Sequence, residues 1–168
     1  MTTSAVVYSF LFIHIGVILV ITAYYAVGSL LAPALTERAR TRFAARPWLP
    51  VLVGLGVSVP WVLAAIVLLN LPAAPAKFAG AVLGCGWVLC GLIGGAAIAQ
   101  QVGRGGGPAP LPWVAAVRGG LLITLTWVLP LVGWLGMLPL SLATGVGCLI
   151  LGIAPMRSNR ATAVPATV

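Results

Sequence analysis

The chain has 168 residues, of which 61% are hydrophobic and only 6% are charged, and its mean hydropathy is +1.17. Soluble domains carry about 25% charged residues, so this chain has too few to cover a water-exposed surface. The composition excludes soluble enzymes and nucleic-acid-binding domains and indicates an integral membrane protein, because the basic residues lie at the ends of apolar runs.

The first apolar run covers residues 5–31 and ends near Pro33. It is much longer than the apolar region of a signal peptide, about 7–15 residues, and no positive charge precedes it. We therefore expect a retained membrane span. As one helix it would exceed a hydrocarbon core of about 30 Å, so it should tilt or project.

A basic segment, TERARTRFAARPW, follows this run and is the only charge-dense part of the chain. Basic residues near a membrane surface are attracted to anionic headgroups, by about 1 kcal/mol each. Docking of an acidic cytoplasmic partner is the alternative, but headgroup contact needs nothing beyond the bilayer. The residues predicted to make these contacts are Arg38, Arg40, Arg42 and Arg46.

Two further spans are predicted at residues 49–71 and 78–99, the first with a kink at Pro60. The Gly- and Pro-rich segment 100–112 then predicts a flexible loop. The third span contains two GxxxG pairs, which allow close approach of helix backbones in lipid. We expect them to pack against another helix of this chain, with a neighbouring subunit as the alternative. The four glycines of these pairs are Gly80, Gly84, Gly91 and Gly95.

The last apolar stretch, residues 119–154, carries no charge but is interrupted by Pro and Gly between positions 130 and 139. We expect two short legs, 119–135 and 138–154, each about 25 Å long as a helix and near the lower limit for spanning. The predicted fold is an all-α polytopic bundle with four full spans plus a short final leg. That final pair either completes five spans or forms a re-entrant hairpin.

The distribution of basic residues predicts an orientation, because cytoplasmic loops collect Lys and Arg. With two final legs, eight of the nine basic residues lie on one side and only Lys77 on the other. We therefore expect a bacterial inner-membrane protein with its N-terminus outside. The residues from 156 to 168 would form a flexible cytoplasmic tail.

His14 is the one ionisable group predicted deep within a span. Such groups are costly in lipid and often functional. A ligand for haem or a chlorophyll-type metal, or a proton relay, is one interpretation. A neutral histidine hydrogen-bonded to a neighbouring helix is the interpretation we favour, so no cofactor and no metal site are predicted.

Catalysis is not expected. The chain has one acidic residue, Glu37, and no Asp, so a Ser/His/Asp triad cannot form. A conduit for ions or small molecules would need a polar lining, and the candidates for it are sparse. They are Ser9, His14, Thr22, Ser58, Thr124, Thr126, Ser141 and Thr144.

The C-terminal stretch beginning GRGGGPAPLPWVAAVRGG resembles a bacterial membrane module that often accompanies bactofilin-type polymer-forming domains. The module has Gly-Arg after a span, a Pro-containing loop, a Gly-started apolar run, a Pro-x-x-Gly-Trp turn and a second run with alternating glycines. The resemblance implies two legs joined near 130–134. It supplies no catalytic residues, and the polymer-forming domain is absent here. The matching positions are Gly103, Arg104, Gly119, Gly120, Pro130, Gly133, Trp134, Gly145 and Gly147.

Together these features predict a non-enzymatic multi-pass membrane protein. Its partners would be the lipid bilayer and either a second copy of itself or other membrane subunits, with no nucleic acid. An accessory or structural subunit is the leading hypothesis. A conduit and a pigment- or haem-binding subunit through His14 are the alternatives.

Overall fold

The structure is a computed structural model that describes residues 2–107, 109, 111–129 and 131–154. Within these ranges the chain forms six α-helices and one short π-helical segment, and it contains no strand. Four helical segments are long and apolar enough to cross a membrane: Ser4–Leu31, Trp48–Asn70, Ala74–Gly105 and Val132–Ile153. The all-helical fold is thus confirmed, with four candidate spans. The predicted tail, residues 156–168, lies outside the described residues.

The first two helices are α1 (Thr2–Leu31) and α2 (Pro33–Ala45). The residue before a proline is disfavoured in helical geometry. Ala32, which precedes Pro33, accordingly leaves the helix with φ −131° and ψ 60°, and Pro33 then occupies the first turn of α2. Arg46 precedes Pro47 and leaves helical geometry in the same way, with φ −146° and ψ 83°. Prolines thus separate the basic helix from the long apolar helices beside it.

The next two helices, α3 (Trp48–Asn70) and α4 (Ala74–Gly105), form a hairpin. The bounds of α3 lie within one residue of the predicted span, and Pro60 is inside the helix. Helix α4 runs six residues past the predicted end at 99, so the start of the expected loop is helical. The reason is tertiary packing, because Gln100 is buried and Gly103 lies against the backbone of α5.

The last apolar stretch divides earlier than predicted. Helix α5 (Pro112–Trp127) ends shortly before position 130, whose proline disfavours helical geometry in the residue before it. The π-helical segment η1 (Val132–Met137) then continues directly into α6 (Leu138–Ile153). A break around residues 136–137 was the wrong expectation. A wide π turn precedes Pro139, where a regular α turn would meet the proline ring.

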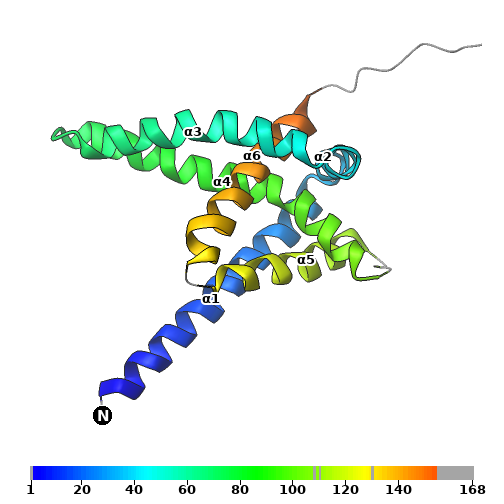
Figure 1. Cartoon of the computed structure of the whole chain (residues 1–168), viewed down its shortest axis with the longest axis horizontal. Coiled ribbons are helices and arrows are strands. Elements are labelled where there is room, and N and C mark those ends of the chain that lie inside the picture. The colour runs from blue at the N-terminus through cyan, green and yellow to red at the C-terminus, as the bar shows by residue number, and fades with distance from the viewer. Residues whose placement is uncertain (1, 108, 110, 130, 155–168) are drawn as a thin grey trace, which may run out of the picture.

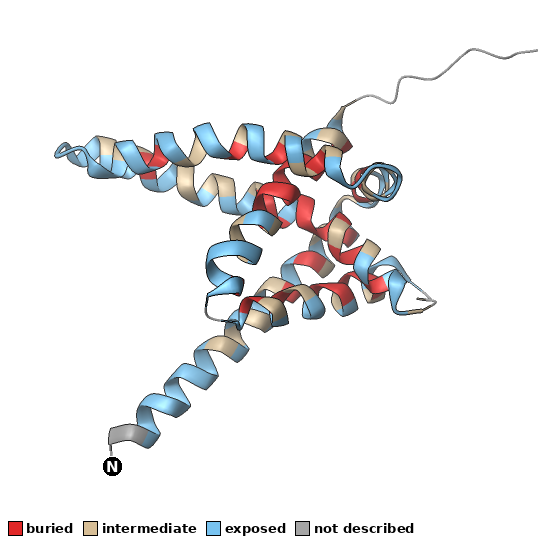
Figure 2. Ribbon diagram, viewed as in Figure 1, coloured by how far each residue is buried: buried red, intermediate tan, exposed pale blue. Residues whose placement is uncertain are grey.

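Three arms diverge from one end of the molecule (Figure 1). They are α1, the α3–α4 hairpin and the shorter α5–α6 hairpin that lies between them. Helix α2 lies at the end where the arms meet. Buried residues concentrate near that end, whereas the free end of α1 is exposed nearly all round and that of the α3–α4 hairpin is exposed except where its two helices face each other (Figure 2).

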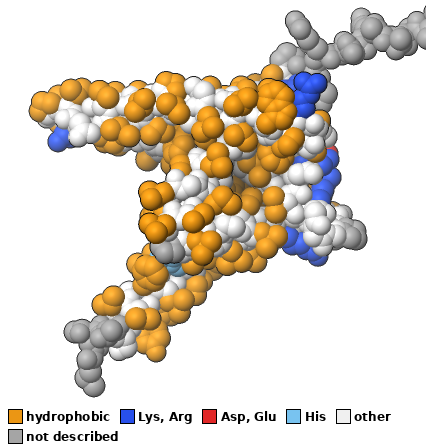
Figure 3. Space-filling model, in the orientation of Figure 1, with side chains coloured by type: hydrophobic (Ala, Val, Ile, Leu, Met, Phe, Trp, Pro, Cys, Tyr) orange, Lys and Arg blue, Asp and Glu red, His pale blue; other side chains and the backbone are white. Residues whose placement is uncertain are grey.

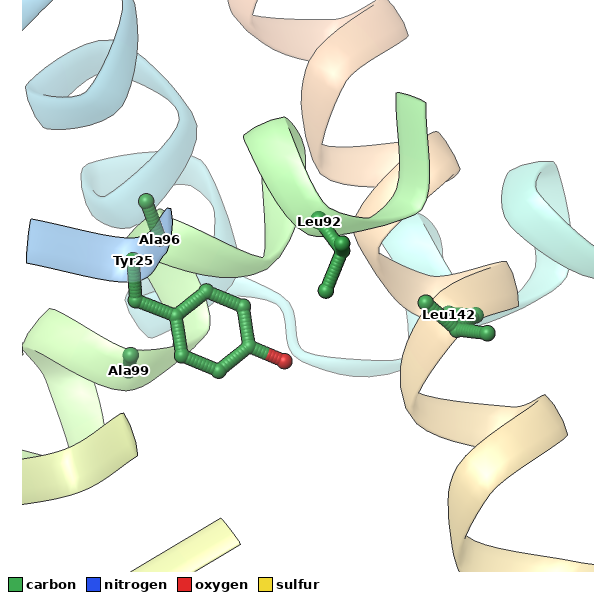
Figure 4. Packing of buried hydrophobic residues seen from close by; sticks show 5 residues of the cluster. All are labelled: Tyr25, Leu92, Ala96, Ala99 and Leu142. Atoms are coloured by element: carbon green, nitrogen blue, oxygen red, sulfur yellow. The ribbon is translucent and has the colours of Figure 1, made fainter. Parts of the chain in front are cut away.

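Helix α4 is the centre of the packing, since it contacts each of the other five α-helices. The main apolar cluster joins Tyr25 of α1 with Leu92, Ala96 and Ala99 of α4 and Leu142 of α6 (Figure 4). Two of these five residues are alanines, and glycines of α4 lie against the backbones of α5 and α6. The helices therefore approach closely, and their association depends on van der Waals contact between backbones.

Candidate functional site: a basic end and an apolar groove

The basic residues gather at the end where the arms meet, on α2 and on the adjoining ends of α4 and α5 (Figure 3). Lys77, near the start of α4, belongs to the opposite tip of the α3–α4 hairpin. This separation is expected for a membrane protein, because Lys and Arg collect in the loops on one side of the membrane.

Two of the four arginines on and beside α2 are engaged within the protein. Arg42 donates hydrogen bonds to the carbonyl oxygens of Leu151 and Ala154, the latter at 3.1 Å. The last carbonyls of a helix lack partners inside the helix, and a cation there also complements the helix dipole. Arg42 therefore caps α6 and ties it to α2.

Arg40 forms the second internal contact, with Glu37 one turn earlier. Its Nε atom donates to Glu37 Oε2 at 3.0 Å, and its Nη1 atom donates to Gln101 of α4 at 2.9 Å. Arg104 of α4 adds a weaker ion pair with Glu37 at 3.5 Å. The hydrogen bond from Arg40 lowers the pKa of Glu37, and the positive charges of Arg40 and Arg104 lower it further. Burial raises it, by less than the hydrogen bond lowers it, so the net direction is downward.

Arg38 and Arg46, the other two arginines of this segment, are exposed, as is Arg118 of α5. Within the described ranges both ion pairs involve Glu37, so these three guanidinium groups are available to ligands outside the chain. The predicted contact segment therefore contains residues of two kinds. Arg40 and Arg42 hold α2 against α4 and α6, while Arg38 and Arg46 face outward.

Three of the four predicted packing glycines lie against other helices. A Cβ atom added at Gly80 would lie 2.9 Å from the Ala65 carbonyl oxygen of α3, and one at Gly91 would lie 2.9 Å from Leu142 of α6. A Cβ at Gly95 would lie 2.7 Å from the Tyr25 ring. Gly84 differs, because nothing lies within 4 Å of its hypothetical Cβ.

The tightest helix contacts involve glycines that the GxxxG pattern did not select. At each of three crossings a glycine of one helix lies against the backbone beside a glycine of another, and a Cβ on either would overlap a carbonyl oxygen. One crossing joins α3 to α6, one joins α4 to α6 and one joins α4 to α5. The three glycine pairs are Gly54 with Gly147, Gly94 with Gly145, and Gly103 with Gly119.

His14 lines a small cavity of about 150 Å³ between α1, α5 and the η1–α6 segment. Its Nδ1 atom lies 2.8 Å from the carbonyl oxygen of Phe10, and the two rings are 3.9 Å apart. This hydrogen bond is to a residue of its own helix and not to a neighbouring helix, the partner that the sequence predicts. Among the described residues, no group of three or more His, Cys, Asp or Glu side chains could hold a metal ion.

A second cavity is an apolar groove of about 710 Å³, here called the α3–α5–α6 groove. Its walls come from the start of α3, the middle of α5 and the η1–α6 segment, and α4 contributes Ile98 and Val102. Phe43, Pro47 and Trp48 line it next to the basic segment. The sequence offered little indication of it, because its lining residues come from five α-helices and the η1 segment.

Trp127 lies between the two cavities and lines both of them. Its side chain is only 6% exposed, and its indole N–H finds no acceptor among the described residues. A buried donor without a partner is costly, so an acceptor supplied from outside the chain would be favoured at this position.

Comparison of the chain with protein-family models, curated proteins and solved structures finds no match. The resemblance to the bactofilin-associated module therefore stays a prediction from its residues, and the functional argument depends on the geometry above.

Proposed function

We propose that this chain is a non-enzymatic multi-pass protein of a bacterial inner membrane, serving as an accessory or structural subunit that packs against itself or a larger membrane complex. Four long apolar helices support the multi-pass arrangement. The basic end, on the α2 side, would face the cytoplasm and the Lys77 tip the opposite side, in keeping with the positive-inside rule.

The observation that carries the proposal is the contrast between the two ends of the molecule. At the basic end, three glycine crossings join α3, α4, α5 and α6 into one body. At the other end α1 projects alone, and only 6% of its most apolar segment is buried. A projecting apolar helix in a membrane offers a surface on which a second copy or another subunit packs through van der Waals contact.

A photo-crosslinking amino acid at Phe12 tests this function in native membranes. Phe12 lies on the projecting half of α1 and is 72% exposed, and Phe78, at the tip of the α3–α4 hairpin, is 73% exposed and serves as the matched comparison. We expect a protein adduct of defined mass from position 12 in excess of any from position 78. Recovery of monomer alone from position 12 would contradict the proposal.

The two alternative functions, a conduit and a pigment- or haem-binding subunit, gain no comparable support from the geometry. In the large groove, Thr126, Ser141 and Thr144 direct their hydroxyl donors to carbonyls of their own helices, which leaves an apolar lining for any solute. The cavity beside His14, at about 150 Å³, is smaller than the roughly 300–1,000 Å³ of typical cofactor sites. A visible absorption spectrum with pigment bands in the purified protein would favour the His14 alternative instead.

A further inference from the structure

We propose that the α3–α5–α6 groove binds an acyl chain of an anionic phospholipid whose headgroup is held by Arg46 and Arg118. This site goes beyond the subunit role proposed above and does not depend on it. The argument uses two properties of the groove: its lining and the charges at its basic end.

The lining selects an alkyl chain over a polar ligand. The groove volume of about 710 Å³ falls in the range of ligand sites, roughly 300–1,000 Å³. Three side chains in the lining carry a hydroxyl group, and each hydroxyl donates to a carbonyl of its own helix, at 2.6 Å for Thr126, 2.9 Å for Ser141 and 2.7 Å for Thr144. The surface presented to an occupant is therefore hydrocarbon.

The charges next to the groove select an anionic headgroup. Arg46 directly precedes Pro47 and Trp48, which line the wall formed by α3. Arg118 precedes Leu122 of the opposite wall by four residues, so both lie on one face of α5. Both arginines are exposed, and Glu37, the only acidic side chain of the chain, is engaged by Arg40 and Arg104.

The same geometry gives the bound lipid a direction. The basic segment and Trp48 belong to the level of the headgroups, where Trp and Arg concentrate in membrane proteins. From Arg118 to Trp127 helix α5 advances nine residues, about 13 Å toward the membrane interior. The acyl chain would therefore lie along α5 from the level of Arg118 to that of Trp127, with its headgroup at the basic end.

Native mass spectrometry of the purified full chain tests the site. The protein is mixed with phosphatidylglycerol or phosphatidylcholine of identical acyl chains, and the lipid retained per monomer is counted. We expect one phosphatidylglycerol retained in preference to phosphatidylcholine. Replacing both arginines (Arg46→Gln with Arg118→Gln) should lower that preference about 25-fold, since each basic residue near an anionic headgroup contributes about fivefold.

Matched variants separate this site from general attraction to the basic end. The double variant Arg38→Gln with Lys77→Gln removes the same charge from exposed positions outside the groove and should keep the preference. Leu140→Trp fills the groove and should abolish retention, while Leu125→Trp, at an exposed position outside it, should not.

Three results would overturn the proposal. They are equal retention of the two lipids by the wild-type chain, equal losses in the two charge-removal variants, and retention by Leu140→Trp at the wild-type level. Circular dichroism and monodispersity establish that each variant is folded. The charge-removal pair changes only exposed side chains, so it tests the headgroup contact even if Leu140→Trp does not fold.

Discussion

Gly94 of α4 lies with its α-carbon directly against the backbone of Gly145 of α6, so that a Cβ atom on Gly94 would overlap the Gly145 carbonyl oxygen. A neighbouring side chain can change rotamer to make room, but a helix backbone cannot. Gly145 meets α4 and Gly147, two residues later, meets α3. The alternating glycines of α6 thus let this helix pack against α4 and α3 at the same time.

Substitution of Gly94 by Val should separate α4 from α6. The added side chain overpacks a backbone-to-backbone contact, so we expect a loss of about 3 kcal/mol in the free energy of unfolding, the upper end of ordinary overpacking. Gly84→Val provides the control, because it lies on the same helix with nothing within 4 Å of its Cβ position. Thermal unfolding in detergent measures both, and equal stability of the two variants would contradict the role of the crossing.

Removal of the Arg42 side chain should free the end of α6. Arg42→Gln loses the charged hydrogen bonds to the Leu151 and Ala154 carbonyls, and bonds to charged groups contribute about 1.5–3 kcal/mol. Hydrogen exchange at residues 150–154 should rise, together with a lower unfolding temperature. Arg38→Gln, at an exposed position of the same helix, should change neither the exchange at these residues nor the unfolding temperature. Unchanged exchange in Arg42→Gln would exclude the capping role.

Glu37 should make the attachment of α2 dependent on pH. Contact with Arg40 lowers the pKa of this carboxyl below its ordinary value of 4.5. A carboxyl with a lowered pKa in the folded state contributes stability that is fully present above its unfolded-state pKa, and this stability is lost as the pH falls through the folded-state pKa. We therefore expect wild type and Glu37→Gln to differ most near neutral pH.

The measurement for Glu37 is a series of unfolding temperatures from pH 7 to pH 3. The difference between wild type and Glu37→Gln should shrink as the pH falls below about 4.5, the ordinary pKa, because the unfolded chain then takes up a proton before the folded chain does. Because Glu37 is partly exposed, salt should weaken the difference at neutral pH. A constant difference over the whole series would contradict the ionic contact.

Hydropathy alone predicted α3 to within one residue, because Pro47 and Pro72 lie beside its ends and every residue between 49 and 69 is uncharged. It did not predict the division of the last apolar stretch. Two prolines and two glycines there offered several break points, and the helix ends before the proline at position 130 but not at Pro139. A π turn absorbs that proline, so the helix continues through it.

The candidate site was less predictable than the helices. The GxxxG spacing identifies glycines on one face of a helix but not whether another helix covers that face, as Gly84 demonstrates. Nothing in the sequence distinguishes the arginines of α2 from one another. In the structure, however, Arg42 contacts α6, more than a hundred residues later along the chain. Such long-range partners depend on how the three arms meet, which local patterns do not encode.

Labelling of single cysteines should reveal the orientation. With the basic end in the cytoplasm, Lys77→Cys would face outward, and a membrane-impermeant maleimide should label it in intact cells. Arg38→Cys, equally exposed on α2, should react only after the membrane is permeabilised. The reason is that the cytoplasmic side collects basic residues, which here lie with α2. The background for both variants replaces the native thiols with Ala, namely Cys85, Cys90 and Cys148.

The reverse labelling pattern would invert the orientation, and labelling of both positions in intact cells would contradict a chain that crosses the membrane between them. A tag placed after residue 168 gives an independent measurement. If α5 and the η1–α6 segment enter and return as a pair, the tag shares the side of Arg38, whether the pair spans the membrane or only dips into it. A tag on the side of Lys77 would mean that the final stretch crosses once, and the paired arrangement of α5 and α6 in a membrane would be wrong.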